Sequence, residues 1–402
     1  MTLLFCLFGK MGTTNAQWTQ LSSGTTLKLN EIFFTSKDTG YVVGDKETIL
    51  KTTNAGEQWI AQKAGVGLNF NDVYFINGRQ GWIVADSGTI CSTVNGGNNW
   101  NCSSLDSAFK IDLHSVYVLN EQSILIGGIN EGIYGYIGKS INGGKTWTRS
   151  TIETHLWTVD ILKIAMVNKE IGFALTRGMV LKTSDGGLNW KITDTSSVKK
   201  GQMFSILEDI AVFPINDTMF VCGWYTSYFG STENGGDNWT HNTSSDYFNL
   251  DFLTPKVGYA VGWGNMHKTT DGGKTFTDAS GGNSFFFGSI YSMDFVDEWT
   301  GFACGDYGLI IKTTNGGNTT ASITNPPRTK EFISVYPNPT DGVIQFSNEM
   351  ASVVSSIKGE IIAKNARSKS IDVSQLPSGM YILTLLDDQG FAVQNVKILK
   401  SN

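Results

Sequence analysis

Residues 95–100 of the chain read NGGNNW, and six variants of this stretch occur elsewhere in the sequence. The variants are NAGEQW (54–59), NGGKTW (142–147), DGGLNW (185–190), NGGDNW (234–239), DGGKTF (271–276) and NGGNTT (315–320). Ala55 and Gly316 hold the same place in the first and last copies and are 261 residues apart (316 − 55), so the six intervals average about 43.5 residues. The chain therefore contains seven copies of one structural unit.

Each copy carries strand signals in the same order. The first is a run with alternating apolar residues, as in LNEIFF (29–34), FNDVYF (70–75) and IYSMDF (290–295). A glycine-aromatic run follows, as in GYVVG (40–44), GWIV (81–84), GFAL (172–175), GYAVG (258–262) and GFACG (301–305). A third run, such as ILKT (49–52) or IIKT (310–313), enters the turn, and a fourth run led by Trp leaves it. No long window has helical periodicity, so the sequence predicts an all-β fold. Seven units of this length predict a closed seven-bladed β-propeller.

The turn residues have a structural explanation. Asn and Asp side chains hydrogen-bond the backbone two residues further on, and Gly adopts positive φ without steric cost. An Asn-Gly or Asp-Gly pair between two strands therefore predicts a hairpin. We expect this structural role for Asn54, Asn95, Asn142, Asp185, Asn234, Asp271 and Asn315. The Trp that follows offers a large apolar face for packing between sheets.

The turn motif resembles the bacterial-neuraminidase repeat, or Asp-box, whose pattern is Ser/Thr-X-Asp-X-Gly-X-X-Trp. With the glycine-aromatic strand and the ILKT-like strand, the whole unit is most similar to the propeller repeat of photosystem II assembly factors. The resemblance covers residues 18–320 and implies a seven-bladed β-propeller. Five of the seven turns carry Asn in place of Asp, and Ala55 replaces a Gly of the first turn. These departures preserve the turn chemistry but weaken the case for a charge-dependent role.

The two ends of the repeat region complement each other. The seventh copy lacks its aromatic residue, whereas QWTQL (17–21) resembles QWIAQ (58–62) without a turn before it. We expect this N-terminal strand to complete the last blade, so that a propeller spanning residues 17–320 has no long open edge. Residues 1–16 hold a short apolar run, LLFCLF (3–8), and end on the small residue Ala16, which predicts a signal peptide.

The composition favours an exported protein that faces solution. The net charge is −6 and the pI is about 5.3, so we expect no surface for nucleic acid. No later segment approaches about 18 consecutive apolar residues, so we expect no transmembrane segment.

The cysteines suggest one disulfide and no metal site. Cys91 and Cys102 are symmetric about the Gly96-Gly97 turn, so an aligned hairpin would bring them face to face, and an exported protein could oxidise them. Cys222 and Cys304 occupy one register in different repeats and are expected to be small buried residues. The spacings match no zinc motif, and we expect no metal or cofactor.

The C-terminal region has a different character. A Pro-containing linker, assigned to residues 321–331, ends the repeats. Residues 332–402 contain VYPNPTDG (335–342) near their start and LPSGMY (376–381) further on, and they end on a run with Lys397 and Lys400. This region resembles the type A C-terminal sorting domain of the type IX secretion system. The resemblance implies a small β-sandwich, a secretion machinery as partner, and export through the periplasm to the outer-membrane surface or the medium.

The expected ligand face lies opposite the turns. In a four-stranded blade, the connections before the first strand and between the second and third strands emerge on that face. Aromatic residues are frequent there, and the candidate ligand-binding set is Trp157, Trp224, Tyr225, Tyr228, Trp263, Tyr307, Tyr134 and Tyr136. Asp45, Asp86, Glu131 and Asp306 share the face and would make it acidic, whereas FFF (285–287) is expected to be buried. Exposed aromatic rings suit a protein or glycan partner.

Catalysis is the alternative. Asp-box propellers include sialidases and other glycosidases, but sialidases need an arginine cluster that begins with an Arg-Ile-Pro motif. Here the repeats contain only Arg79, Arg149 and Arg177, and no Arg-Ile-Pro occurs. His114, His155, His241 and His267 lie in different repeats without metal-ligand spacing. The sequence therefore favours a secreted, non-catalytic binding propeller, with a glycan-directed enzyme or a lectin as the alternative.

Overall fold

The computed structural model describes residues 18–105, 111–131, 134–153, 160–194, 206–213, 218–224, 228–243, 246–262, 265–280, 288–317, 335–336, 340–356, 361–386 and 392–400. In these residues the regular structure consists of strands and one short 3-10 helix, η2 (Asp306–Gly308). The all-β prediction is therefore confirmed. None of the described residues belongs to a helix long and apolar enough to cross a membrane.

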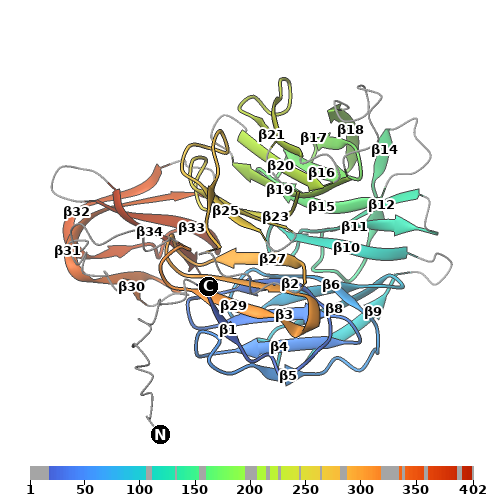
Figure 1. The fold of residues 1–402 in the computed structure, drawn as a ribbon, viewed down its shortest axis with the longest axis horizontal. Coiled ribbons are helices and arrows are strands. Elements are labelled where there is room, and N and C mark those ends of the chain that lie inside the picture. Colours follow the sequence, from blue (N-terminus) through green and yellow to red (C-terminus); the bar gives the residue numbers. More distant parts are fainter. Residues whose placement is uncertain are drawn as a thin grey trace, which may run out of the picture.

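The repeats form seven consecutive antiparallel sheets (Figure 1). The first three are β2 (Leu29–Phe34), β3 (Gly40–Gly44), β4 (Thr48–Thr52) and β5 (Ile60–Gln62); β6 (Phe70–Phe75), β7 (Gly81–Ala85), β8 (Thr89–Thr93) and β9 (Asn101–Ser104); and β10 (Ile111–Val118), β11 (Ile124–Asn130), β12 (Tyr134–Ser140) and β13 (Thr148–Arg149). The fourth consists of β15 (Ile161–Met166), β16 (Gly172–Thr176), β17 (Val180–Thr183) and β18 (Asn189–Asp194), with β14 (Thr151–Glu153) added parallel to β18.

The last three sheets follow the same order. They are β19 (Ile206–Phe213), β20 (Thr218–Trp224), β21 (Tyr228–Thr232) and β22 (Thr240–Thr243); β23 (Tyr247–Phe252), β24 (Gly258–Gly262), β25 (Met266–Thr269) and β26 (Thr277–Asp278); and β27 (Ile290–Phe295), β28 (Gly301–Gly305), β29 (Ile310–Thr313) and β1 (Thr19–Leu21).

The first strand of each sheet lines a central channel. These inner strands are β2, β6, β10, β15, β19, β23 and β27, and each contacts the next. The ring is closed because β27 also contacts β2. The seven sheets therefore surround one axis, as the repeat length predicts.

The N-terminal strand β1 completes the seventh sheet. It pairs antiparallel with β29, with Thr19 opposite Lys312 and Leu21 opposite Ile310. The preceding Trp18 is fully buried, and its Nε1 donates to the carbonyl oxygen of Ala279 at 2.9 Å. Because the two ends of the repeat region share one sheet, the ring does not depend on the C-terminal domain for closure.

Aromatic stacking between neighbouring sheets explains the glycine-aromatic strands. The ring of Tyr41 stacks on Phe75 at the end of the next inner strand, with centroids 3.9 Å apart. Tyr259 and Phe295 repeat this contact at 3.7 Å. The glycine before the aromatic is required by close packing, because a Cβ at Gly81 would approach the Phe75 ring to 2.5 Å.

The Asn/Asp-Gly-Gly turns are held by their own side chains and by the preceding sheet. In the second turn, Asn95 Oδ1 accepts from the backbone N–H of Asn99 at 3.0 Å. Lys51 of the first sheet donates to the Gly96 carbonyl at 2.6 Å, and Tyr41 donates to the same oxygen at 3.0 Å. Lys182 and Lys312 make the corresponding contacts with the next turns, which explains the Lys of the ILKT-like strand.

A disulfide joins Cys91 of β8 to Cys102 of β9, which are directly opposite each other in the hairpin. Cys222 and Cys304 are free and buried. Burial raises the pKa of both thiols well above the usual range, so they act as small core residues.

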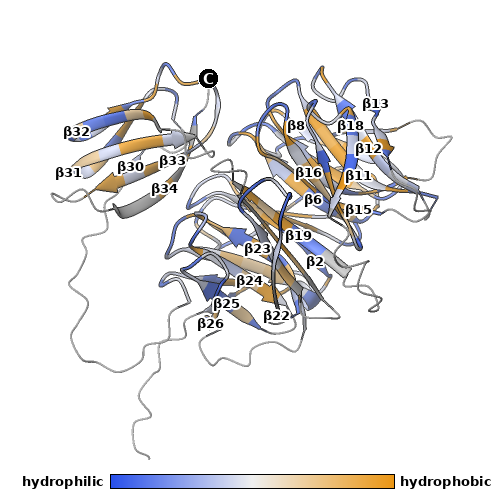
Figure 2. Cartoon of the chain, turned by 90° about the horizontal axis from the view of Figure 1, so that it is seen from above, coloured by the Kyte–Doolittle hydropathy of each residue, from blue (hydrophilic) through white to orange (hydrophobic). Residues whose placement is uncertain are grey.

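The C-terminal domain is a separate β unit beside the propeller (Figures 1 and 2). Its strands are β30 (Val335–Tyr336), β31 (Val343–Ser356), β32 (Ile361–Asp372), β33 (Gly379–Leu386) and β34 (Ala392–Lys400). The long strand β31 pairs with β32 along both halves, and its register shifts between Gln345 and Met350. Residues from both halves, including Ile344 and Val354, pack into one core with Leu383 of β33. Figure 2 shows hydrophobic colouring concentrated along the strands of both units.

Candidate functional site

A β-bulge shapes the start of every inner strand. In β2, Leu29 is opposite Gly44 and Glu31 is opposite Val43, so Asn30 has no partner of its own. The same register shift occurs in β6, β10, β15, β19, β23 and β27. A bulge re-aims the side chains around it, and here bulge residues and the residues that follow them line one end of the channel.

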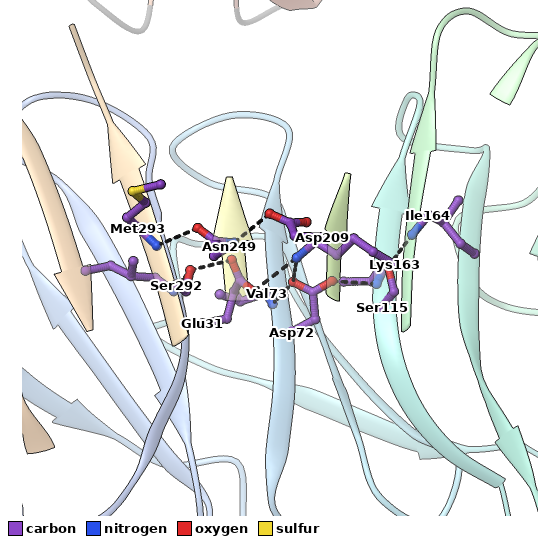
Figure 3. Close-up of polar contacts among 12 residues, drawn as sticks. Glu31, Asp72, Val73, Ser115, Lys163, Ile164, Asp209, Asn249, Ser292 and Met293 are labelled. Atoms are coloured by element: carbon purple, nitrogen blue, oxygen red, sulfur yellow. Dashed lines mark hydrogen bonds and ion pairs between the residues drawn. The ribbon is translucent and has the colours of Figure 1, made fainter. Parts of the chain in front are cut away.

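The residues that directly follow the bulges of the inner strands form a polar ring inside the channel (Figure 3). We call this set the channel ring, and its members are Glu31, Asp72, Ser115, Lys163, Asp209, Asn249 and Ser292. They come from seven different sheets but occupy the same position in each. Figure 3 shows them pointing toward one another across the axis.

The channel ring connects neighbouring sheets. An inner strand is the edge of its sheet, so its outward N–H groups need partners from elsewhere. Ser115 Oγ accepts from the N–H of Ile164 at 3.0 Å, and Asn249 Oδ1 accepts from the N–H of Met293 at 3.0 Å (Figure 3). Asp209 Oδ2 accepts from the next sheet in the same way, from Leu250 at 2.8 Å. These bonds satisfy buried backbone donors and fix the spacing of the blades.

Lys163 is the cation of the channel ring. Its Nζ lies 3.1 Å from Glu31 Oε2 and 3.6 Å from Asp72 Oδ1, so it bridges sheets on opposite sides of the channel. Burial raises the pKa of Glu31 to about 7 despite this pairing, and burial raises the pKa of Asp209 to about 6. The carboxylates Asp72 and Glu31 raise the pKa of Lys163 above its usual value despite its burial, so the ammonium remains charged. Burial is the main reason that the carboxyl groups of the ring hold protons well, and the excess of three carboxyl groups over one ammonium adds to it.

The channel opens into a cavity of about 440 Å³ at this end, which we call the mouth cavity. One wall is aromatic, because Phe248 stacks on Tyr291 with centroids 5.9 Å apart and Lys28 Nζ lies 3.9 Å above the Tyr291 ring. The opposite wall includes Arg177, whose guanidinium bonds the buried Asp160 at 3.1 Å while the side chain stays 59% exposed. An aromatic wall facing an accessible guanidinium suits a ligand with both apolar and polar groups.

The acidic residues expected on this face hold loops in place. Asn30 Nδ2 donates to Asp45 Oδ1 at 3.2 Å and to the carbonyl of Phe70 at 2.9 Å. Asn71 makes the matching pair with Asp86 and Leu113. The bulge residues thus tie the loop of one sheet to the inner strand of the next. Among the described residues, no group of three or more His, Cys, Asp or Glu could hold a metal ion.

The aromatic residues expected to bind ligand have mixed positions. Tyr307 is 74% exposed and has a φ of 57°, and Tyr134 is 46% exposed. The expectation for Tyr136 is wrong: it is 7% exposed and packs in the core between the second and third sheets, because its position in β12 points inward. Trp157, Tyr225, Trp263 and the run 285–287 lie outside the described residues, as do the side chains of Trp224 and Tyr228 in β20 and β21.

The channel ring and the mouth cavity were missed by the sequence reasoning. The available signal was a polar residue at the same place in the first strand of each repeat, within a run of mostly apolar residues. That signal could have identified the ring, but not the pairing of Lys163 with Glu31 across the axis, because blades distant in sequence meet only in the closed fold.

Comparison with protein-family models gives two matches. Residues 63–209 match the model described as photosynthesis system II assembly factor YCF48, and residues 334–400 match the model described as secretion system C-terminal sorting domain. The chain joins YCF48-like repeats to a secretion sorting domain. Comparison with curated protein sequences gives no significant match.

Solved structures support the propeller fold. The structure of YCF48 bound to D1 peptide has a TM-score of 0.61 and 18% identity, covering 74% of this chain and 97% of that one. YCF48 from Cyanidioschyzon merolae has a TM-score of 0.59 and 20% identity, covering 74% and 98%. An ancestral GH74 enzyme also has a TM-score of 0.59, with 13% identity, covering 95% of this chain and 55% of the enzyme. At 13 to 20% sequence identity, these similarities show a shared fold and do not by themselves show a shared function.

Proposed function

We propose that the protein is a secreted or cell-surface, non-catalytic β-propeller that binds a segment of a protein partner in the mouth cavity. The observation that carries this proposal is the cavity itself, with the Phe248 and Tyr291 wall facing Arg177. The YCF48-like repeats indicate protein binding, and one of the similar solved structures is a YCF48 bound to a peptide.

The non-catalytic part of the proposal rests on the state of the buried acids. Glu31 accepts from Ser292 at 2.8 Å and pairs with Lys163, and Asp209 accepts from Asn249 at 2.8 Å. These carboxyl groups connect neighbouring blades. Buried structural groups of this kind can have raised pKa values without taking part in catalysis.

A glycan-directed enzyme or lectin is the second candidate. The exposed rings of Tyr307 and Tyr134 and the likeness to the GH74 fold favour it. The test presents the mature propeller, residues 17–320, to a peptide display library and to a glycan array in parallel. Enrichment of peptides with an empty glycan array supports the proposal. Binding to the glycan array alone, or release of sugar from a bound glycan, overturns it.

The sorting domain indicates export to the cell surface or into the medium. We propose that residues 1–16 direct the chain to the periplasm and that a type IX system carries it across the outer membrane. Removing residues 329–402 should leave a folded propeller in the periplasm, because β1 and β29 close the ring within the remaining chain. The truncated protein should be assayed by cell fractionation, and its appearance outside the cell at the full-length level would contradict the proposed route.

A further inference from the structure

The opposite end of the channel has an apolar opening. Phe33, Tyr74 and Tyr117 each lie two residues after the channel ring on three successive inner strands and form a row of rings, with centroids 5.3 Å and 5.4 Å apart. Ala165 and Ala211 continue this position around the axis. We call this opening the turn-side mouth, because it lies on the side of the Asn/Asp-Gly-Gly turns.

The sorting domain presents an apolar strand face to the turn-side mouth. In β33, Tyr381 and Leu383 point into the core of the domain, so Met380 and Ile382 lie on its other face. Met380 and Ile382 line a cavity of about 290 Å³ together with the rings of the turn-side mouth. Strand β33 is therefore apolar on both faces, and such strands are usually buried on both faces. The core of the domain covers one face, and the turn-side mouth lies against the other.

Two further contacts fix this arrangement. Asp297 of the propeller and Val396 of β34 form an isolated antiparallel bridge. A second cavity of about 300 Å³ is lined by Ser378, Gly379 and Met380 and by the hairpin turns that follow β6, β10 and β15. Figure 1 shows the C-terminal strands beside the propeller, with β33 and β34 nearest to it.

The contact is apolar but incompletely packed. Each cavity has room for several water molecules, and unfilled volume removes dispersion contacts from the groups that line it. We therefore expect the two domains to dock on each other and also to be able to separate.

We propose that the propeller shields the Ser378–Ile382 segment of its own sorting domain, and that the two domains must separate before the secretion machinery engages this segment. The proposal rests on the proposed export. The shielded segment includes part of the LPSG stretch by which the sorting domain is recognised in the sequence, so docking and recognition compete for the same residues.

A reversible cross-link tests the proposal in the full chain. Residues paired in an antiparallel bridge have Cα atoms about 4.5 to 5.5 Å apart, which suits a disulfide. The double variant Asp297→Cys/Val396→Cys should therefore oxidise in the periplasm and lock the docked state. We expect its export to fall about tenfold or more below that of either single variant, as measured by cell fractionation and non-reducing electrophoresis.

A matched pair of substitutions tests docking separately. Adding Ile382→Asp to the double variant should prevent the cross-link, because a carboxylate would be buried against the aromatic rings. Adding Ile362→Asp should leave the cross-link intact, since Ile362 is a 41% exposed apolar residue of the same domain that lines neither cavity.

Two results would overturn the proposal. One is a double variant that forms the cross-link fully yet leaves the cell as efficiently as the single variants. The other is a cross-link that does not form at all in the Ile362→Asp control. Retention of the unmodified chain in the periplasm would instead contradict the proposed export, so the two failures are distinguishable.

Discussion

At the scale of single residues, Asp185 shows that a side-chain oxygen which accepts backbone hydrogen bonds holds the Asp-box turn. Its Oδ1 accepts from the backbone N–H groups of Leu188 and Asn189, each at 3.0 Å. Although desolvation opposes it, the hydrogen bonds from Asn189 lower the pKa of Asp185 to about 2. Asn142 makes the corresponding backbone contact, with Thr146 at 2.9 Å. The amide oxygen of Asn thus replaces the carboxylate in the turn.

We predict that Asp185→Asn lowers the free energy of unfolding by less than about 0.5 kcal/mol, whereas Asp185→Ala lowers it by about 1 kcal/mol. Trp190→Ala should cost roughly 3 to 5 kcal/mol, because Trp190 is fully buried and its removal leaves a cavity. Chemical denaturation of the three variants measures these differences. An Asp185→Asn variant as unstable as Trp190→Ala would contradict the structural interpretation of the turn.

The channel ring predicts a pH dependence. The pKa of Glu31 is raised to about 7 and that of Asp209 to about 6, so the folded state binds these protons more tightly than the unfolded state does. The stability that these groups contribute is present below about pH 4 and is lost as the pH rises through about 6 and 7, so the free energy of unfolding should fall by roughly 1 to 3 kcal/mol between pH 5 and pH 8. The raised pKa of Lys163 adds a contribution that is constant across this window, because it is fully present below about pH 10 and is lost only above that.

Glu31→Gln should reduce this dependence between pH 5 and pH 8, because the substituted amide does not titrate and only Asp209 then contributes. Glu57→Gln is the matched control, since Glu57 is an exposed residue of the first turn and should leave the slope unchanged. Thermal unfolding at several pH values gives the slopes. An unchanged slope in Glu31→Gln would mean that the ring carboxyl groups are not the source.

At the scale of secondary-structure elements, β1 closes the ring. Deleting residues 17–23 removes the pairing with β29 and the buried Trp18, so we predict a melting temperature lower by roughly 5 to 15 °C. Trp18→Ala should reproduce much of this loss. Gln20→Ala should not, because Gln20 is exposed in the same strand. A deletion variant that melts with the full chain would show that β1 contributes nothing to closure.

The strands were predictable because their signals are local. Alternating apolar residues, the glycine before an aromatic and the Asn/Asp-Gly-Gly turn each lie within a few residues of the element they specify. The inward orientation of Tyr136 was not predictable, because β12 is longer than the third strands of the other sheets and its register cannot be read from the pattern alone.

At the scale of the whole molecule, the two openings of the channel have different chemistry. The mouth cavity combines charged and aromatic side chains near the starts of the inner strands, whereas the turn-side mouth is mainly apolar and faces the sorting domain. The repeat count predicted the ring, but the contents of the channel depend on residues more than a hundred positions apart, such as Glu31 and Lys163. A single sequence carries no direct signal for such pairs.

The proposal that ligand binds in the mouth cavity can be tested directly by substitutions at the two ends of the channel. The measurement is the affinity of a peptide selected by the mature propeller for three variants of that propeller. We predict that Tyr291→Ala and Arg177→Ala weaken binding about tenfold or more, which corresponds to about 1.4 kcal/mol for each. Trp299→Ala, a 38% exposed aromatic residue on the turn side, should leave the affinity within about twofold. Loss of binding in Trp299→Ala with full affinity in the other two variants would contradict the assignment of function to the mouth cavity.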